Sequence, residues 1–429
     1  MKHRIVVLGA GYAGAWAAGN LARRLSPADT EITVVNAVPD FVERMRLHQL
    51  AAGNDLSFRS LTGVFAGSGV RLRVARVTGV DPQRKTVTLT DEGGLHGRHG
   101  EYGEYGEYGE YGEYGEYGEY GEYGEYGEGE LAYDTLLYTL GSSVAQHGVP
   151  GVAEHAFDVT GLSSALRLRE RLTRLGAGGT VLVVGEGLTG IEAATEFAES
   201  RPDLCVSLAA RGEVGGWLSP RARRHLRRAF DRLGITVHDN SGIDAVEPGR
   251  AITADGRSLT ADVTVWSAGF AVHPLAAASG LEVTGSGRIV VDRTMRSLTH
   301  PDVYAAGDCA HAIGENGRPL PMSCATAGFT AQQATAAITA RLTGRKVPLT
   351  GLKYYGNHIS LGRRDAIFQM VDADVRSASW YLGGASAARL KSAILTGAGW
   401  NVAHPTFGLP ARTRRLAAAP HASGVGAAA

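Results

Sequence analysis

Residues 3–14 read HRIVVLGAGYAG, and this stretch decides the fold. The apolar run HRIVVL is typical of a buried parallel strand, and the small residues after it predict a helix over residues 12–25. The turn between them has the spacing Gly-x-Gly-x-x-Gly. Gly9 permits the tight turn, Gly11 lets a pyrophosphate approach the backbone at the helix N-terminus, and Gly14 lets helix and strand lie close together. The stretch therefore predicts a dinucleotide-binding unit.

A second strand, predicted at residues 31–36, completes a βαβ unit and supports this interpretation. The residue at the end of that strand normally holds the ribose hydroxyls and is normally Asp or Glu. Here it is Asn36, which can bond a hydroxyl but carries no charge. The departure weakens the expected ribose contact without breaking the pattern.

A second turn of the same spacing, Gly185-Glu186-Gly187-Leu188-Thr189-Gly190, lies farther along the chain. A strand is predicted before it at residues 180–185, a helix after it at 188–200, and another strand at 205–210. Two complete turns indicate two dinucleotides. Two adenine dinucleotides in one chain suggest a flavin and a nicotinamide.

The choice between NADH and NADPH stays open at the end of this second unit. The position of the ribose-binding acid is Ala210, and a cation, Arg211, follows it. Arg211 could pair with the 2′-phosphate of NADPH, or it could be a solvated surface residue. Glu213 lies close enough in sequence to complicate either interpretation.

Composition limits the class of protein. The length of 429 residues predicts two or three domains. The net charge is zero, but residues 101–130 carry 11 Glu and no Lys or Arg, so the remainder has a charge of +11. Three cysteines exclude a disulfide scaffold, and no run approaches the roughly 18 apolar residues of a membrane span. The N-terminus lacks the pattern of a signal peptide, so we expect a cytoplasmic protein.

A low-complexity repeat explains the acidic segment. Glu-Tyr-Gly is repeated nine times from Glu101 to Gly127, without proline or any aliphatic residue to bury. We expect a disordered or weakly ordered loop. The flanking segments, residues 70–90 with a turn at Asp81-Pro82 and residues 131–141, predict an antiparallel meander around it.

Three further motifs point to a family. They are Tyr138-Thr139-Leu140-Gly141, Trp266-Ser267-Ala268-Gly269-Phe270 and Val303-Tyr304-Ala305-Ala306-Gly307-Asp308, the last followed by a predicted small-residue helix. With the two glycine turns they cover roughly residues 3–340 and resemble the flavoproteins of the pyridine nucleotide–disulfide reductase superfamily. The resemblance implies that Asp308 bonds the ribityl chain of FAD and that NAD(P)H docks on the second glycine turn.

Within that superfamily the chain resembles type II NADH dehydrogenases and their relatives. Residues 47–53, Thr189–Glu192 and residues 354–370 are similar to segments of that branch, and residues 41–48 hold no redox cysteine pair. The resemblance implies that Glu192 lies close to the nicotinamide–flavin stack, and that the segment containing His48 and Gln49 lines the flavin. These three are the catalytic candidates, and for an organic acceptor His48 and His358 are candidate proton donors.

One departure from that branch concerns the quinone side. The family carries two Gln after a Pro in its quinone-side helix, whereas here Ala325 and Phe329 occupy those places. Gln332 and Gln333 come later and are expected to face elsewhere. An apolar pocket containing Ala325, Phe329 and Met322 would still admit a flat aromatic acceptor.

The remaining predicted contacts belong to the two cofactors, and no metal site is predicted. For FAD they are Gly9, Gly11, Tyr12, Ala13, Gly14, Asn36, Arg44, Val77, Thr139, Leu140, Gly141, Gly307, Asp308, Cys324 and Ala325. For NAD(P)H they are Gly185, Gly187, Leu188, Thr189, Gly190, Arg211, Ala268 and Gly269.

The expected fold is α/β, with two Rossmann-like dinucleotide-binding domains, antiparallel meander insertions and a small α+β C-terminal domain. The expected divisions are an FAD domain in two parts (1–150 and 273–345), an NAD(P) domain (151–272), a C-terminal domain (346–410) and a flexible tail (411–429).

Three functions fit this organisation. The first is an NAD(P)H oxidoreductase acting on a quinone-like acceptor. The second is a flavin oxidoreductase of specialised metabolism acting on a small organic substrate, and the third is an electron-transfer reductase for a protein partner. The Arg-rich helix predicted after Ser219-Pro220 lacks neighbouring aromatic motifs, so we do not expect the protein to bind nucleic acid. We expect at most peripheral contact with the inner face of a membrane, and a homodimer is left open.

The repeat yields a direct test. We expect deletion of Glu101–Glu128 to leave FAD content and NAD(P)H oxidation intact, because the repeat has no aliphatic residue to bury. Loss of bound flavin, measured by absorbance of the purified protein, would instead show that the segment is structural.

Overall fold

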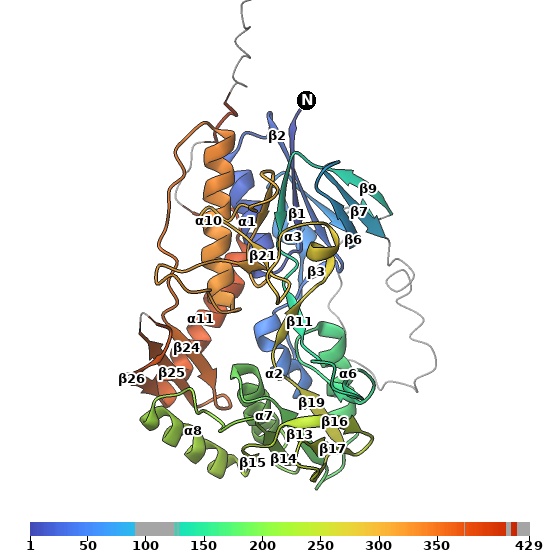
Figure 1. Ribbon diagram of the computed structural model, residues 1–429, viewed down its shortest axis with the longest axis vertical. Helices are drawn as coiled ribbons and strands as arrows, with labels where there is room; N and C mark the ends of the chain where they lie inside the picture. Colours follow the sequence, from blue (N-terminus) through green and yellow to red (C-terminus); the bar gives the residue numbers. More distant parts are fainter. Residues whose placement is uncertain (91–124, 127, 373, 409–412, 418–429) are drawn as a thin grey trace, which may run out of the picture.

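A computed structural model describes residues 1–90, 125–126, 128–372, 374–408 and 413–417 (Figure 1). Its first domain is built on a six-stranded parallel sheet in the order β22-β10-β1-β2-β5-β8. Without the outermost β8, the five remaining strands lie in the spatial order 3-2-1-4-5 when they are numbered along the chain. This is the strand order of a Rossmann unit, as predicted. The strands are β1 (His3–Leu8), β2 (Thr30–Asn36), β5 (Val70–Val74), β8 (Glu125–Tyr126), β10 (Thr135–Tyr138) and β22 (Val303–Ala305).

Two long helices lie against this sheet. Helix α1 (Tyr12–Arg24) follows the first glycine turn, and α10 (Cys324–Leu342) runs alongside it (Figure 1). Ala15, Ala17 and Ala18 of α1 are completely buried, because small side chains let the helix approach both the sheet and α10.

The second domain repeats the architecture with a five-stranded parallel sheet in the order β12-β19-β13-β14-β15. Its strands and helices are β12 (Ala156–Phe157), α6 (Leu162–Thr173), β13 (Thr180–Val184), α7 (Leu188–Ser200), β14 (Cys205–Ala209), α8 (Pro220–Leu233), β15 (Thr236–His238) and β19 (Val263–Trp266). Ser219 caps α8 by accepting a hydrogen bond from Ala222 N–H, with Pro220 at the first helical position, as the sequence predicts.

Small antiparallel sheets are inserted in both domains, and a two-stranded link joins them. The first insertion contains β6 (Arg76–Asp81), β7 (Thr86–Thr90) and β9 (Gly129–Ala132); the second contains β16 (Ile243–Glu247), β17 (Arg250–Thr253) and β18 (Ser258–Thr260); the link pairs β11 (Ser142–Val144) with β20 (Phe270–Val272).

The third part of the fold is a C-terminal sheet with a helix. Strands β24 (Gly356–Ser360), β25 (Ala366–Val371) and β26 (Ser377–Gly383) are antiparallel, and α11 (Ala385–Ala403) packs against them and against α1 (Figure 1). After α11, Arg414 forms a β-bridge with Leu25 at the end of α1.

Short elements complete the described chain. They are β3 (Asp40–Phe41), η1 (Arg44–Arg46), α2 (Leu47–Ala51), β4 (Arg59–Ser60), α3 (Leu61–Phe65), α5 (Val152–His155), α9 (Leu275–Ala278), β21 (Ile289–Val290) and β23 (Ala310–His311).

Two sequence predictions need correction. Residues 70–74 and 135–138 do not belong to an antiparallel meander, because β5 pairs parallel with β2 and β10 pairs parallel with β1 in the main sheet. The antiparallel hairpin starts only at Arg76. No helix follows Asp308. Instead β23 pairs parallel with β21, and the small-residue helix starts at Cys324.

The predicted loop of the repeat falls mostly on residues 101–124 and 127, outside the described residues. Glu125–Tyr126, within the repeat, form β8 at the edge of the main sheet, parallel to β5.

Candidate active site

The first glycine turn has the geometry that its spacing predicts. Gly9 has a φ of +89°, and a Cβ on Gly14 would lie 1.9 Å from the carbonyl oxygen of Gly9. Side chains at both positions are therefore excluded. The Thr139 hydroxyl donates to the carbonyl oxygens of Leu8 (2.7 Å) and Gly9 (3.0 Å), which ties the turn to the end of β10.

The second turn repeats this construction. Gly185 has a φ of +128°, and a Cβ on Gly190 would lie 2.0 Å from the Gly185 carbonyl oxygen. Ser267 takes the role of Thr139 and donates to the Val184 carbonyl oxygen at 3.0 Å. Our sequence prediction omitted Ser267, although its place between Trp266 and Ala268 matches that of Thr139 in the other junction motif.

The middle glycine of each turn faces open space. A Cβ built on Gly11 or on Gly187 would meet no atom of the described chain within 4 Å. The free backbone at a helix N-terminus is what a pyrophosphate requires. Both turns therefore fit a dinucleotide.

Other predicted FAD contacts gather around the first turn. Asn36 accepts a hydrogen bond from Ala10 N–H (2.9 Å) and donates to the Val38 carbonyl oxygen (2.7 Å), so it also holds the turn itself. Asp308 accepts a hydrogen bond from the Ser142 hydroxyl at 2.7 Å. Gly307 N–H donates to Thr330 on α10.

Arg44 has an unfilled donor at this site. Its Nη1 donates to the Ser142 carbonyl oxygen (2.5 Å), and its guanidinium carbon lies 5.3 Å from the centre of the Phe270 ring. Its Nη2 is buried without a hydrogen-bond partner in the described chain. Such an atom is expected where a polar cofactor group supplies the partner.

The other predicted residues lie as follows. Val77 on β6 and Leu140 pack against the first core, and Leu188 and Thr189 form the first turn of α7. A Cβ on Gly141 would lie 4.0 Å from Arg44 Nη1. Ala268 accepts a hydrogen bond from His147, Gly269 has a φ of +116°, and Arg211 is exposed after β14.

Three parts of the chain meet at Glu192. Glu192 lies in the first turns of α7 and is 8% exposed, and Lys391 reaches it from α11 with Nζ at 2.9 Å. Its carboxylate also accepts Ser360 N–H from β24 at 2.9 Å. Burial by itself would raise the pKa of Glu192, but the Lys391 charge and the hydrogen bond from Ser360 N–H help to outweigh it, so the pKa lies below its ordinary value. Glu192 is thus held as a buried carboxylate.

Lys391 was absent from our sequence prediction. It stands 199 positions from Glu192, in a helix whose amphipathic pattern is weak, so no local motif marks it.

Two imidazoles surround this pair. His48 on α2 is 5% exposed, and burial lowers its pKa; burial and the Lys391 charge lower the pKa of His358 to about 4. Both rings are therefore neutral near pH 7. His48 Nε2 and His358 Nδ1 are buried without a partner in the described chain, so each has an atom free for a ligand.

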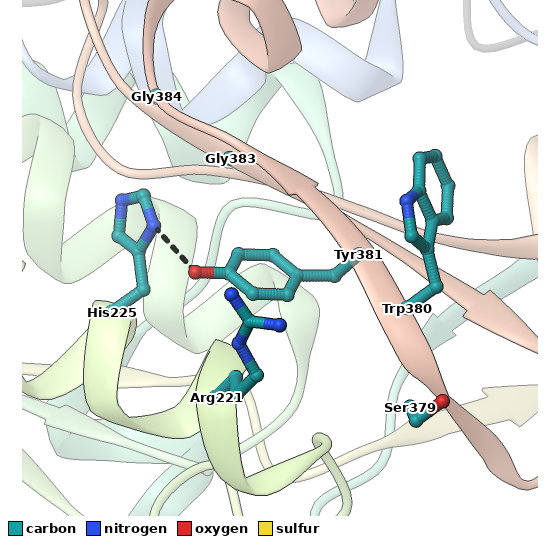
Figure 2. A pocket seen from close by; sticks show the side chains of 7 residues that line it. All are labelled: Arg221, His225, Ser379, Trp380, Tyr381, Gly383 and Gly384. Atoms are coloured by element: carbon teal, nitrogen blue, oxygen red, sulfur yellow. Dashed lines mark hydrogen bonds between the residues drawn. The ribbon is translucent and has the colours of Figure 1, made fainter.

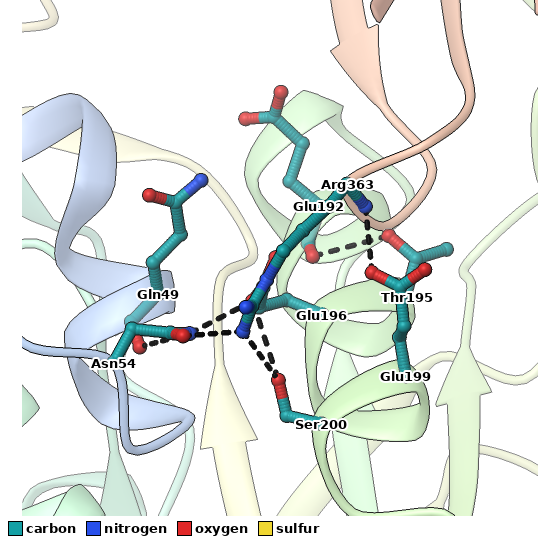
Figure 3. A network of polar contacts seen from close by, with 8 residues as sticks. All are labelled: Gln49, Asn54, Glu192, Thr195, Glu196, Glu199, Ser200 and Arg363. Atoms are coloured by element: carbon teal, nitrogen blue, oxygen red, sulfur yellow. Dashed lines mark hydrogen bonds and ion pairs between the residues drawn. The ribbon is translucent and has the colours of Figure 1, made fainter. Parts of the chain in front are cut away.

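The side chains of Gln49 and Glu192 point in the same direction, as Figure 3 shows. Both point away from a second buried carboxylate, Glu196. Glu196 is 1% exposed and accepts hydrogen bonds from Arg363 Nη2 (3.0 Å) and Asn54 Nδ2 (2.9 Å). This network joins α7, the end of α2 and the loop after β24.

The region that the sequence predicts to face the acceptor is the start of α10. Ala325 is exposed on the first turn of α10, and the rings of Phe329 and Tyr355 meet edge-to-face with centroids 6.2 Å apart. Gln333 is completely buried and bonds to Thr350 and Pro348, while Gln332 is exposed. Both therefore face elsewhere, as expected.

Cys309 and Cys324 are poor nucleophiles. Burial raises the pKa of Cys309 and of Cys324 to about 12. Neither would be a thiolate near pH 7. This agrees with the absence of a redox cysteine pair from residues 41–48.

A separate pocket of about 390 Å³ lies between α8 and β26 (Figure 2). Arg221, His225, Trp380 and Tyr381 help to line it, and the Tyr381 hydroxyl faces His225 Nδ1 at 3.5 Å. It contains none of the predicted site residues, so it is distinct from the glycine turns.

The described residues offer neither a metal site nor a membrane span. They hold no group of three or more His, Cys, Asp or Glu that could bind a metal ion. None of their helices has the length and apolarity needed to cross a membrane.

Comparison with known proteins assigns the family. Residues 3–334 match the model of the pyridine nucleotide-disulphide oxidoreductases. The chain belongs to this family. It is an FAD-dependent NAD(P)H oxidoreductase, and its two glycine turns are of the kind that such cofactors need.

Individual relatives agree with this assignment. An NADH dehydrogenase-like protein of Mycobacterium tuberculosis is 31% identical over 348 residues, which cover 75% of this chain and 76% of the relative. A type II NADH:quinone oxidoreductase of Staphylococcus epidermidis is 25% identical over 426 residues, which cover 92% of this chain and 94% of the relative. NDH2 of Plasmodium falciparum, solved with NADH, shares the fold with a TM-score of 0.73 at 15% identity, covering 95% and 97% of the two chains.

The two glycine turns should be separable by mutation. We expect Gly14→Ala to purify without FAD, because its methyl group would collide with the Gly9 carbonyl oxygen. Gly190→Ala should keep FAD but raise the KM for NAD(P)H by roughly tenfold or more. Flavin absorbance and steady-state kinetics measure the two effects. Gly161→Ala is the control, since its Cβ would meet no described atom within 4 Å; equal losses in both variants would contradict the assignment.

The Glu196 network should stabilise the joined domains. We expect Arg363→Ala to lower the free energy of unfolding by roughly 2 kcal/mol, because Glu196 stays buried with its charge less compensated. Thermal unfolding of the FAD-loaded protein measures this. The neighbouring exposed Arg364→Ala is the control, and an identical midpoint for both variants would show that the ion pair contributes nothing.

Proposed function

We propose that the protein oxidises NAD(P)H and passes the electrons to a quinone-like or other flat aromatic acceptor. The observation that carries this proposal is the buried Glu192–Lys391 pair between neutral imidazoles, where both dinucleotide domains and the C-terminal helix meet. The proposal is also supported by the relatives, which are named as an NADH dehydrogenase-like protein and as a type II NADH:quinone oxidoreductase.

The residues have distinct tasks in this proposal. FAD, when bound, supplies a carrier that takes a hydride from NAD(P)H and returns two electrons to an acceptor. The two glycine turns hold the dinucleotides in alignment, and the buried walls around Glu192 keep water out. The ion pair with Glu192 keeps a proton donor, the Lys391 ammonium, at this site, where it also donates to the His358 carbonyl oxygen at 3.2 Å.

The acceptor side supports a flat apolar molecule. Ala325 exposes an apolar side chain on the first turn of α10, and one helical turn further on Phe329 packs its ring against that of Tyr355. Because Gln333 is committed to the 348–350 segment, amide recognition of a quinone carbonyl is not available from it. The same observation favours a second candidate, an aromatic organic substrate other than a respiratory quinone.

An acceptor comparison tests the proposal. Anaerobic stopped-flow should show the flavin bleached by NADH or NADPH and reoxidised by a soluble naphthoquinone. Lys391→Met should slow turnover with the naphthoquinone roughly tenfold or more, because reduction of a quinone consumes two protons. Ferricyanide takes up electrons only, so its rate should change far less.

Lys346→Met, at an exposed position, is the matched control. A flavin that neither nucleotide reduces, or that no quinone reoxidises, would overturn the proposal. Equal slowing with both acceptors would show that Lys391 has only a structural role.

A further inference from the structure

The second dinucleotide-binding unit lacks the acidic residue that usually follows its second strand and binds the ribose. The last residues of β14 lead into Ala210, which is completely buried and has no polar side-chain atom. In a dinucleotide-binding unit this edge lies beside the adenosine ribose, where a carboxylate commonly accepts the 2′-hydroxyl. Discrimination between NADH and NADPH must therefore come from another residue.

Glu186 brings a carboxylate to this edge from the glycine turn itself. Its Oε2 accepts a hydrogen bond from Arg211 N–H at 2.9 Å, and its Oε1 lies 3.9 Å from where a Cβ on Gly212 would stand. The side chain thus spans from β13 to the end of β14. The Glu186 carboxylate therefore supplies a negative charge at the end of β14, where Ala210 stands in place of the usual acidic residue.

The backbone of Glu186 is also held. Trp217 Nε1–H donates to the Glu186 carbonyl oxygen at 3.2 Å, and Gly185 before it has a φ of +128°. Fixed at both its backbone and its carboxylate, Glu186 is pre-organised to accept from a ligand.

The neighbouring charges are otherwise occupied. Glu213, the next carboxylate along the chain, pairs with Arg223 at 2.5 Å. Arg211 is exposed, and its guanidinium is in no ion pair among the described residues. The edge therefore presents one carboxylate and one cation.

We infer that Glu186 selects NADH over NADPH by accepting the ribose 2′-hydroxyl, an inference that rests on the proposed NAD(P)H oxidation. A 2′-phosphate would meet the Glu186 carboxylate, and the Arg211 N–H that could bond it is already taken. Removing the charge of Glu186 removes its repulsion of a 2′-phosphate, so the exposed Arg211 guanidinium, which is in no ion pair among the described residues, can attract that phosphate. The variant then favours NADPH.

Equilibrium binding and kinetics together test this inference. NAD⁺ and NADP⁺ are titrated calorimetrically into the FAD-loaded wild type and Glu186→Gln, and stopped-flow follows flavin reduction by NADH and NADPH. The wild type should bind NAD⁺ more tightly than NADP⁺. In Glu186→Gln the Kd for NAD⁺ should rise roughly tenfold and that for NADP⁺ should fall by a similar factor.

Adding Arg211→Ala to Glu186→Gln should abolish the gain for NADP⁺. Glu154→Gln, an exposed change of the same charge in the same domain, controls for net charge and should leave both constants unchanged.

The outcomes separate this inference from the proposed function. Tighter binding of NADP⁺ by the wild type, or a Glu186→Gln preference equal to that of the wild type, overturns the inference while NAD(P)H oxidation stands. A wild type whose flavin neither nucleotide reduces overturns the proposed function, and the titration then decides the role of Glu186 separately.

Discussion

The close approach of a helix to the end of a strand is the constraint on which the rest of the structure depends. A Cβ on Gly14 would lie 1.9 Å from the Gly9 carbonyl oxygen, and a Cβ on Gly190 would lie 2.0 Å from the Gly185 carbonyl oxygen. Only glycine permits this distance, and only this distance brings the helix N-terminus and its free N–H groups over the strand end. The two dinucleotide sites are therefore consequences of backbone geometry before any side chain contributes.

Side chains then join the two sites into one. Thr139 and Ser267 tie each turn to the neighbouring strand by the same hydroxyl-to-carbonyl contact. Glu192 and Glu196, four positions apart on α7, face two different partners, Lys391 from α11 and Arg363 from the loop after β24. Buried carboxylates are costly without partners, so the C-terminal part of the chain is needed to keep α7 in place.

The start of α10 is where this chain departs from the type II NADH dehydrogenases that it resembles, with Ala325 and Phe329 in place of two Gln. Helix α10 starts with Ser323 as its cap, and Gln333 on the same helix holds the segment around Thr350. What remains near Ala325 is apolar and aromatic.

The sequence by itself determined the two glycine turns, their strands and helices, the α/β class and the pair of cofactors, because these depend on local backbone conformation and periodicity. It misplaced β5 and the segment after Asp308, where strand partners far away in the chain decide the structure. Lys391, Arg363 and the direction of the Glu186 side chain were settled only by the tertiary structure. Their partners lie 25 to 199 positions away, and no local pattern records a contact at that separation.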